Sequence, residues 1–200
     1  MVILPKDFLA MAQSDPRRLV NDYLLAGTPV AFKTYDAYCR FRNALARELH
    51  VHPCAILIRG SARLGYSTAP RVAKAWKSFN AKSDIDVAIV DVDYFNNLDF
   101  AIREWESRQR FPNLHDKNDA HATRQRLRYF NCVSDKCLPP STCDGHRDIM
   151  VNFDTLTYCD VKYEVSAFVF RDWWSLRNRC EHDLQDLCRA IKAGKLPPPP

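Results

Sequence analysis

The chain has 200 residues, of which 46% are hydrophobic and 26% charged, and its formal net charge is +5. This is the length of one domain with a sizeable core and the composition of a soluble globular protein. Pro5, Lys6 and Asp7 interrupt the first apolar run where a signal peptide would continue, and no later run reaches transmembrane length, which argues against a membrane-spanning protein. We therefore expect a cytoplasmic protein with no membrane partner.

The apolar pattern of the first half predicts a helix, two strands and a second helix. An apolar side chain recurs every three or four residues from Thr34, the expected N-cap, to a helix end near His52. The short apolar run CAILIRGS and the run from Asp84 to Asp91 predict buried strands. One-sided apolar spacing from Tyr94 onward predicts the next helix.

The second half is expected to end in a strand and a helix. Residues 131–154 are rich in Cys, Pro, Ser and Gly, which predicts a loop. Alternation in VKYEVSAFVF, residues 161–170, predicts a third strand. The final helix is predicted to run from about Asp172 to Ala193, with Gly194 as its C-terminal cap.

These elements predict one α+β domain that spans residues 1–200, with a small mixed β-sheet and helices packed on it. Helices are expected within residues 1–52 and the sheet with its inserted helices within residues 53–170. The C-terminal helix is expected within residues 171–194, and a proline-rich tail follows at 195–200.

Two aspartates stand one residue apart in the second predicted strand, in the stretch AKSDIDVAIVDVD. Asp84 and Asp86 share one strand face because side chains at i and i+2 point to the same side. Two carboxylates held that close repel each other unless a cation or a shared proton relieves them. Mg²⁺ prefers oxygen ligands and is often held by one or two carboxylates together with substrate phosphates. The pair is therefore a candidate metal site, and two solvated aspartates at a surface strand end are the alternative.

A glycine-serine turn follows the first predicted strand, in the stretch RGSARLGYS. Two of the five glycines of the chain, Gly60 and Gly65, fall here. A strand that turns into a helix at Gly60 and Ser61 exposes backbone N–H groups that favour an anionic phosphate, and the Ser61 hydroxyl adds a donor. An ordinary Gly-Ser turn is the alternative.

Together, RGSARLGYS and SDIDVAIVD resemble the signature of the DNA polymerase β-like nucleotidyltransferase superfamily, in its minimal form. The resemblance is specific over about residues 56–93 and implies a polymerase β-like palm fold. It also implies a metal-dependent transfer of a nucleoside monophosphate from a nucleoside triphosphate, expected to be ATP, to a hydroxyl of a protein or RNA acceptor with release of pyrophosphate. Some minimal members act in toxin-antitoxin or defence systems, a context that comes by analogy alone.

The resemblance implies that Gly60 and Ser61 hold the triphosphate, and the neighbouring cations Arg59 and Lys82 are predicted to assist. Twenty-two residues separate Ser61 from Asp84, which is more than many members of the superfamily show. The cations of this insert either clamp the triphosphate or the acceptor, or decorate a surface loop. They are Arg71, Lys74, Lys77 and Lys82.

The resemblance also implies that Asp84 and Asp86 bind two Mg²⁺ ions, with Mn²⁺ as the alternative ion, and that a third acidic residue on a later strand completes the site. Glu164 is the first choice because it lies inside the third predicted strand. Asp160, just before that strand, is the alternative. The predicted catalytic and metal-binding residues are therefore Asp84, Asp86 and Glu164.

The predicted loop contains three cysteines and a histidine, which are residue types that hold zinc. They are Cys132, Cys137, Cys143 and His146. The spacing lacks the two-residue interval between thiols that marks zinc sites, so unliganded cysteines are the favoured interpretation. The basic stretch RQRLRYF, residues 124–130, is either a solvated helix face or a nucleic-acid contact.

The sequence supports two main classes of function, besides a nucleic-acid binder built on residues 124–128 and the cysteine loop. The first is an active nucleotidyltransferase. The second is a catalytically inactive module of the same fold that binds a nucleotide or a partner protein, as an antitoxin or regulator does. The identity of the third carboxylate bears on the choice between them.

Overall fold

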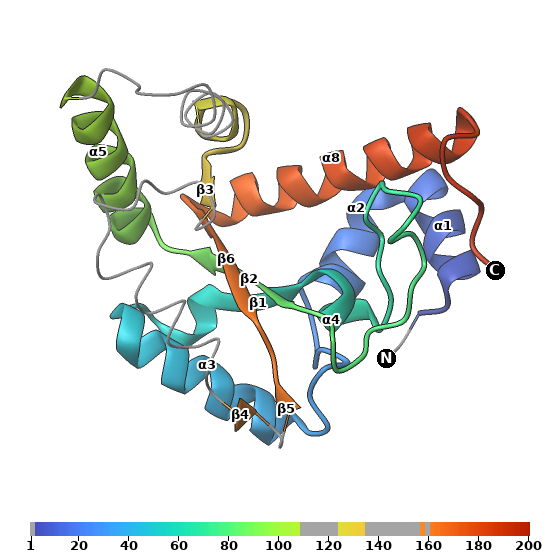
Figure 1. Cartoon of the computed structure of the whole chain (residues 1–200), viewed down its shortest axis with the longest axis horizontal. Coiled ribbons are helices and arrows are strands. Elements are labelled where there is room, and N and C mark those ends of the chain that lie inside the picture. The colour runs from blue at the N-terminus through green and yellow to red at the C-terminus, as the bar shows by residue number, and fades with distance from the viewer. Residues whose placement is uncertain (1–2, 109–123, 135–156, 159–160) are drawn as a thin grey trace.

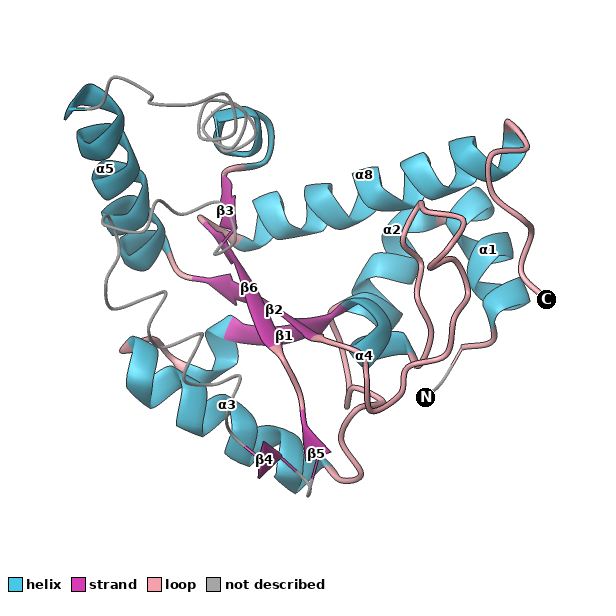
Figure 2. Ribbon diagram, in the orientation of Figure 1, coloured by secondary structure: helices cyan, strands magenta, loops and turns pink. Residues whose placement is uncertain are grey.

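The computed structural model describes residues 3–108, 124–134, 157–158 and 161–200 (Figure 1). Its centre is a four-stranded sheet in the order β1-β2-β6-β3. The strands are β1 (Ile56–Arg59), β2 (Ile85–Val90), β6 (Val165–Phe170) and β3 (Cys132–Ser134). β2 and β6 run parallel, whereas β1 and β3 pair antiparallel with their neighbours. The small mixed sheet expected from the sequence is confirmed (Figure 2).

The third strand is shorter than the sequence pattern predicts. Only β6 enters the main sheet, while β5 (Val161–Lys162) pairs with β4 (Thr157–Tyr158) in a separate two-stranded sheet. Tyr163 and Glu164 connect the two strands. Alternation continues through residues 161–170, so the pattern could not reveal that the chain changes its pairing partner at this point.

The prediction of a loop over residues 131–154 is wrong at its start. Cys132–Ser134 form β3, which pairs with the C-terminal half of β6. All three residues are buried. Three residues are too few for a period-two pattern, and pairing with β6 supplies the backbone hydrogen bonds that make the segment a strand.

Helices cover both faces of the sheet. They are α1 (Pro5–Ser14), α2 (Pro16–Leu19), α3 (Tyr35–Leu49), α4 (Gly60–Leu64), α5 (Val92–Arg108) and α8 (Trp173–Lys192). The described residues also include a π-helical turn (Val20–Leu24), a 3₁₀ turn (Pro53–Ala55) and a helical segment over residues 124–130. The expected caps are present: Thr34 accepts a hydrogen bond from Ala37 N at 3.1 Å, and Gly194 has φ of 69° just beyond α8. The structure adds an N-cap for α8, where Asp172 accepts a hydrogen bond from Ser175 N at 2.7 Å.

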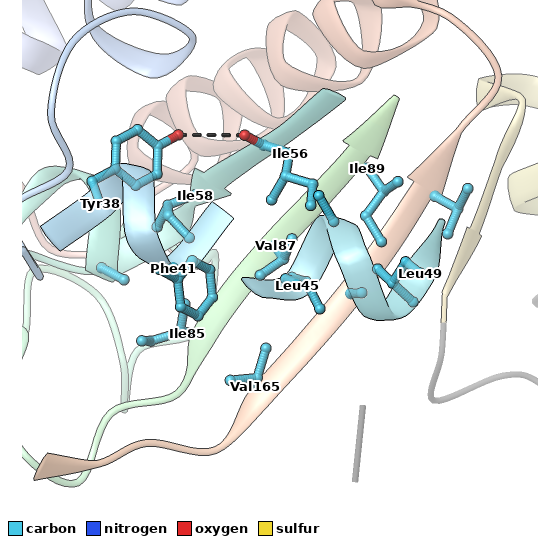
Figure 3. Packing of buried hydrophobic residues seen from close by; sticks show 14 of the residues in the cluster. Tyr38, Phe41, Leu45, Leu49, Ile56, Ile58, Ile85, Val87, Ile89 and Val165 are labelled. Atoms are coloured by element: carbon cyan, nitrogen blue, oxygen red, sulfur yellow. Dashed lines mark hydrogen bonds between the residues drawn. The ribbon is translucent and has the colours of Figure 1, made fainter. Parts of the chain in front are cut away.

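One face of the sheet packs against α3 and α5. Alternate strand residues such as Ile58, Val87 and Val165 point to this face and belong to one cluster with Phe41 and Leu45 of α3 (Figure 3). The hydroxyl of Tyr38, also on α3, donates a hydrogen bond to Ile56 O at 3.4 Å. This cluster explains why every second residue of β2 is apolar and fully buried, and it leaves the aspartates to the opposite face.

The opposite face packs against α1, α2 and α8. Leu57 of β1, Ala88 of β2 and Phe170 of β6 belong to this second cluster, together with Leu176 and Leu184 of α8. In Figure 1, α8 runs alongside α1 and α2 on this side of the sheet. The strand alternation therefore places Asp86 on the α8 face, at the start of β2 and at the edge of this second core.

The insert between the two motifs folds onto the body of the protein. Tyr66 is buried and forms a β-bridge with Ser78, and Phe79 N donates to Gly65 O at 2.8 Å. The indole N–H of Trp76 donates to Pro197 O at 3.0 Å, which ties the insert to the proline-rich tail. The two ends of the insert are therefore held together, and Trp76 beside them is tied to the tail.

Arg63, within the RGSARLGYS stretch, anchors the chain that precedes α3. Its side chain is 8% exposed, and its guanidinium donates to Tyr23 O and to Gly27 O, both at 2.7 Å. Burial lowers the pKa of this guanidinium. The arginine thus holds two backbone carbonyls of the segment before α3 with one buried side chain.

We predict that Arg63→Met lowers the free energy of unfolding by about 3 kcal/mol, because two hydrogen bonds from a charged donor are lost. Urea unfolding followed by circular dichroism measures this. Arg47→Met, at an exposed position of α3, is the control and should change stability by less than about 0.5 kcal/mol. Equal effects of the two substitutions would contradict the anchoring role.

Candidate functional site

The two sequence motifs meet where β1 ends. Arg59, the last residue of β1, pairs in register with Asp86 of β2. The chain then turns into α4 at Gly60, which has φ of 61°. A Cβ added to Gly60 would lie 2.7 Å from Oδ2 of Asp86. Only glycine therefore allows the turn and the carboxylate to lie this close together.

A hydroxyl holds the other side of the Asp86 carboxylate. Ser166, which pairs with Asp86 in the parallel register of β2 and β6, donates from Oγ to Asp86 Oδ1 at 2.9 Å. Ser166 is 2% exposed and Asp86 is half-buried. The carboxylate is thus fixed between a buried serine on β6 and the glycine that begins α4.

Asp84 lies just before β2, and Glu164 lies just before β6. The paired registers begin one residue later, with Ile85 opposite Val165, and Ile85 N donates to Glu164 O at 2.8 Å. The two acids therefore precede neighbouring strands of the sheet. Asp84 is half-buried and Glu164 is exposed. Among the residues that the structure describes, no three acidic, histidine or cysteine side chains form a group that could hold a metal ion. The role of Glu164 as third ligand stays a prediction.

The position facing Asp86 on the next strand is Ser166, and the sequence reasoning missed it. Ser166 was one of the polar residues that alternate through the third predicted strand. A small polar residue enclosed by Val165 and Ala167 was a signal that its side chain has a buried polar partner. The register of β6 against β2, which shows that this partner is Asp86, could not be deduced from the pattern.

Arg59 points to α8. Its guanidinium pairs with Asp183 at 3.1 Å and lies over the rings of Phe168 and Phe170 at 5.7 and 5.4 Å. Burial opposes the charge of this side chain, but nearby Cys180, Asp183 and Asp86 outweigh burial and raise the pKa of Arg59. Arg59 is therefore a fixed positive charge between Asp86 and α8, and its contact with a nucleotide stays a prediction.

The other predicted phosphate-binding residues lie at or near the surface. Ser61 is half-buried in the first turn of α4, and its carbonyl accepts a hydrogen bond from Gly65 N at 2.8 Å. Lys82 is exposed two residues before Asp84, and its backbone N–H donates to Asn80 Oδ1 at 2.9 Å. The remaining cations of the insert are also exposed, namely Arg71, Lys74 and Lys77.

The proposed zinc ligands are only partly within the described residues. Cys137, Cys143 and His146 lie outside them, as does the alternative third acid Asp160. Cys132 is buried in β3, and burial raises the pKa of its thiol to about 11. Zinc binds the thiolate form, so this environment disfavours Cys132 as a ligand.

The donor set at the start of β2 fits a hard divalent cation held by two carboxylates. Asp84 and Asp86 are both half-buried rather than enclosed, and they offer only oxygen atoms. Ser166 holds one oxygen of the Asp86 carboxylate by a hydrogen bond, and the absence of a side chain at Gly60 leaves room for the other. An ion there would complete its coordination with water or with substrate oxygens.

Among the described residues, no helix combines the length and the apolar character needed to cross a membrane. Comparison of the chain with protein-family models, with curated proteins and with solved structures gave no match.

Proposed function

We propose that the protein is a divalent-metal-dependent nucleotidyltransferase that transfers a nucleoside monophosphate, from ATP or another nucleoside triphosphate, to a hydroxyl of a protein or RNA acceptor. One observation carries the proposal: the glycine-serine turn and the aspartate pair, which are far apart in sequence, meet at Gly60 and Asp86. A phosphate chain seated at this turn would lie beside the carboxylates. The acceptor hydroxyl would approach from the exposed side of Asp84.

Each residue of the site has a separate part in this proposal. Asp84 and Asp86 would hold Mg²⁺ or Mn²⁺, which neutralises phosphate charge and activates the attacking oxygen. Ser61 and the backbone N–H groups of the turn would donate to phosphate oxygens. Ser166 positions the Asp86 carboxylate by its hydrogen bond. Such catalysis depends mostly on positioning and on charge stabilisation.

The direct test is a labelling experiment with the full chain. The protein is incubated with each α-³²P-labelled nucleoside triphosphate and Mg²⁺ or Mn²⁺, with and without total cell RNA and cell protein. The proposal expects one acceptor class to become labelled, with release of pyrophosphate in equal amount. Absence of label and of pyrophosphate in every combination would overturn it.

A second candidate function is a catalytically inactive nucleotide-binding module, such as an antitoxin or regulator. Ser166 favours it, because a neutral hydroxyl faces Asp86 on the neighbouring strand, where a carboxylate would complete a three-acid site. A site with two carboxylates holds a divalent cation less tightly than one with three. Nucleotide binding that needs no metal and releases no pyrophosphate would support this candidate.

Ser166→Asp is predicted to separate the two candidates. A third carboxylate beside Asp86 adds negative charge to the site and should tighten Mn²⁺ binding by about tenfold. Without metal, the new repulsion should lower the melting temperature, and saturating Mn²⁺ should restore it. Electron paramagnetic resonance titration with Mn²⁺ and thermal melts measure both effects.

Ser166→Asn is the control, because asparagine has the shape of aspartate without its charge. This variant should show neither the tighter Mn²⁺ binding nor the recovery of the melting temperature by Mn²⁺. A wild-type protein without transfer activity that gains activity in Ser166→Asp would favour the inactive module as the native function. Unchanged Mn²⁺ affinity in Ser166→Asp would mean that no cation lies beside Asp86.

A further inference from the structure

Three large aromatic side chains are exposed where β6 leaves the sheet. Tyr129, at the end of the 124–130 helical segment, is 63% exposed, and Trp173 and Trp174, at the start of α8, are 49% and 61% exposed. None of the three belongs to either core cluster. Because stability is gained from apolar surface that is buried, rings this exposed stabilise the fold much less than buried rings of the same size.

The backbone brings these aromatics together from two distant parts of the chain. Arg171 N donates to Asn131 O at 3.0 Å, and Asn131 Nδ2 donates to Ser175 Oγ at 3.4 Å. Phe130 also joins the 124–130 segment to α8, because its ring centre lies 4.5 Å from the Arg179 guanidinium and 5.0 Å from the centre of the His182 ring. In Figure 1 the segment before β3 lies above the first turns of α8.

The same junction is positively charged. Residues 124–131 and 171–183 together contain six arginines and three acidic residues. The acids already have partners: Asp172 caps α8, Asp183 pairs with Arg59 and Arg179, and Glu181 pairs with Arg17 and Arg177. The side chains of Arg128 and Arg171 are exposed, and the Arg128 guanidinium lies 5.6 Å from the ring centre of Tyr129.

Exposed aromatic rings set among arginines have the chemistry that single-stranded nucleic acids need. Bases stack on aromatic faces without regard to sequence, while arginines neutralise the phosphates between them. Protein interfaces also contain aromatic and arginine side chains, but six arginines against three acids give residues 124–131 and 171–183 a net charge of +3, which calls for a strongly acidic partner. The charge therefore favours a polyanion with stacking bases over a protein.

We propose that Arg128, Tyr129, Arg171, Trp173 and Trp174 form a binding surface for single-stranded nucleic acid, and that its ligand is the RNA acceptor of the site at Asp86. The acceptor role rests on the proposed nucleotidyltransferase function, whereas the binding itself does not. Ser166, beside the site, and Phe170, beside the surface, lie four positions apart on β6. This spacing corresponds to roughly 13 Å along a strand, a distance that a few nucleotides can span.

The test is fluorescence anisotropy of the full chain with a labelled 12-mer of uridylate and the corresponding 12-mer of thymidylate, without nucleotide or metal. We expect Tyr129→Ala and Trp174→Ala each to weaken binding about tenfold or more, because each removes a ring on which a base stacks. The logarithm of the affinity should fall linearly with the logarithm of salt concentration. The double variant Arg128→Ala/Arg171→Ala should reduce this slope by roughly 0.7 for each phosphate that the arginines neutralise.

Matched controls come from α3, on the far side of the sheet. Tyr35→Ala removes a tyrosine that is 60% exposed, and Arg47→Ala removes an exposed arginine. Both should leave affinity unchanged, and thermal melts should show that every variant is folded. Tighter binding of the RNA than of the DNA 12-mer would assign the surface to RNA, and equal binding would overturn its assignment to an RNA acceptor.

The result that overturns the proposal is oligonucleotide binding that is absent, insensitive to salt, or equally affected by the control variants. A surface that serves a protein partner gives the first of these outcomes. Asp86→Asn should retain oligonucleotide binding. If the oligonucleotide binds but no acceptor becomes labelled, the nucleotidyltransferase and its acceptor are refuted and the binding surface is not. If the double variant Tyr129→Ala/Trp174→Ala labels RNA with the same yield as the wild type, this surface alone is refuted as the acceptor site.

Discussion

Asp86→Asn is expected to abolish nucleotide transfer while leaving the fold intact. The amide keeps the shape of the carboxylate, and its oxygen can still accept the hydrogen bond from Ser166 that now reaches Oδ1. What disappears is the negative charge that would hold the divalent cation. Loss of about 4 kcal/mol of transition-state stabilisation by a bound metal corresponds to roughly a thousandfold slower transfer. Pyrophosphate release under saturating nucleoside triphosphate is the measurement.

The control for this substitution is Asp93→Asn, which removes an exposed aspartate in the first turn of α5. It changes the net charge by the same amount and should leave transfer unchanged. Circular dichroism and thermal melts should show that both variants are folded. Undiminished transfer by the double variant Asp84→Ala/Asp86→Ala would refute the site.

Gly60→Ala is expected to reduce transfer by about 100-fold, because displacement of a catalytic group by about 1 Å has an effect of this size. The new Cβ would lie 2.7 Å from Asp86 Oδ2, closer than unbonded atoms can approach. Turning Asp86 away from the new Cβ would break its hydrogen bond with Ser166. The φ of 61° at Gly60 adds the left-handed strain of a residue with a side chain, about 1 to 2 kcal/mol.

The strain and the clash can be measured separately. Gly194 has a similar φ of 69°, but a Cβ added there meets nothing within 4 Å. Gly194→Ala should therefore show the loss of unfolding free energy from strain alone and no loss of transfer. Gly60→Ala should cost more stability than Gly194→Ala, and the excess should shrink in the Asp86→Ala background, where the clashing oxygen is gone. Equal costs in both backgrounds would mean that the glycine does not serve the carboxylate.

An ion pair links α8 to the turn of the candidate site. Arg59 ends β1 directly before the turn at Gly60, and its guanidinium pairs with Asp183 of α8. The same Asp183 pairs with Arg179, whose guanidinium lies over Phe130 at the edge of the proposed nucleic-acid surface. A contiguous chain of contacts thus joins the site to that surface, which is the arrangement expected if both handle one substrate.

Local pattern alone determined most of the elements. The spacing of apolar residues in α3, with Thr34 as its cap, and the Gly194 turn after α8 follow from interactions between residues close in sequence. The buried strands β1 and β2 were predicted from their apolar runs for the same reason. Gly60 and Asp86 were assigned to one site because the two motifs that contain them together resemble a superfamily signature. The structure places the two residues next to each other.

Tertiary structure decided everything that depends on pairing between distant strands. Cys132–Ser134 form a strand only because β6 offers them backbone hydrogen bonds, and residues 161–170 divide because β5 and β6 pair with different strands. The same register places Ser166, rather than an acid, opposite Asp86. A shift of one residue would turn every side chain of β6 to the other face, and nothing in the local sequence fixes that choice. The sequence by itself thus specified two carboxylates beside a glycine turn, and only the folded sheet determined that a serine faces Asp86.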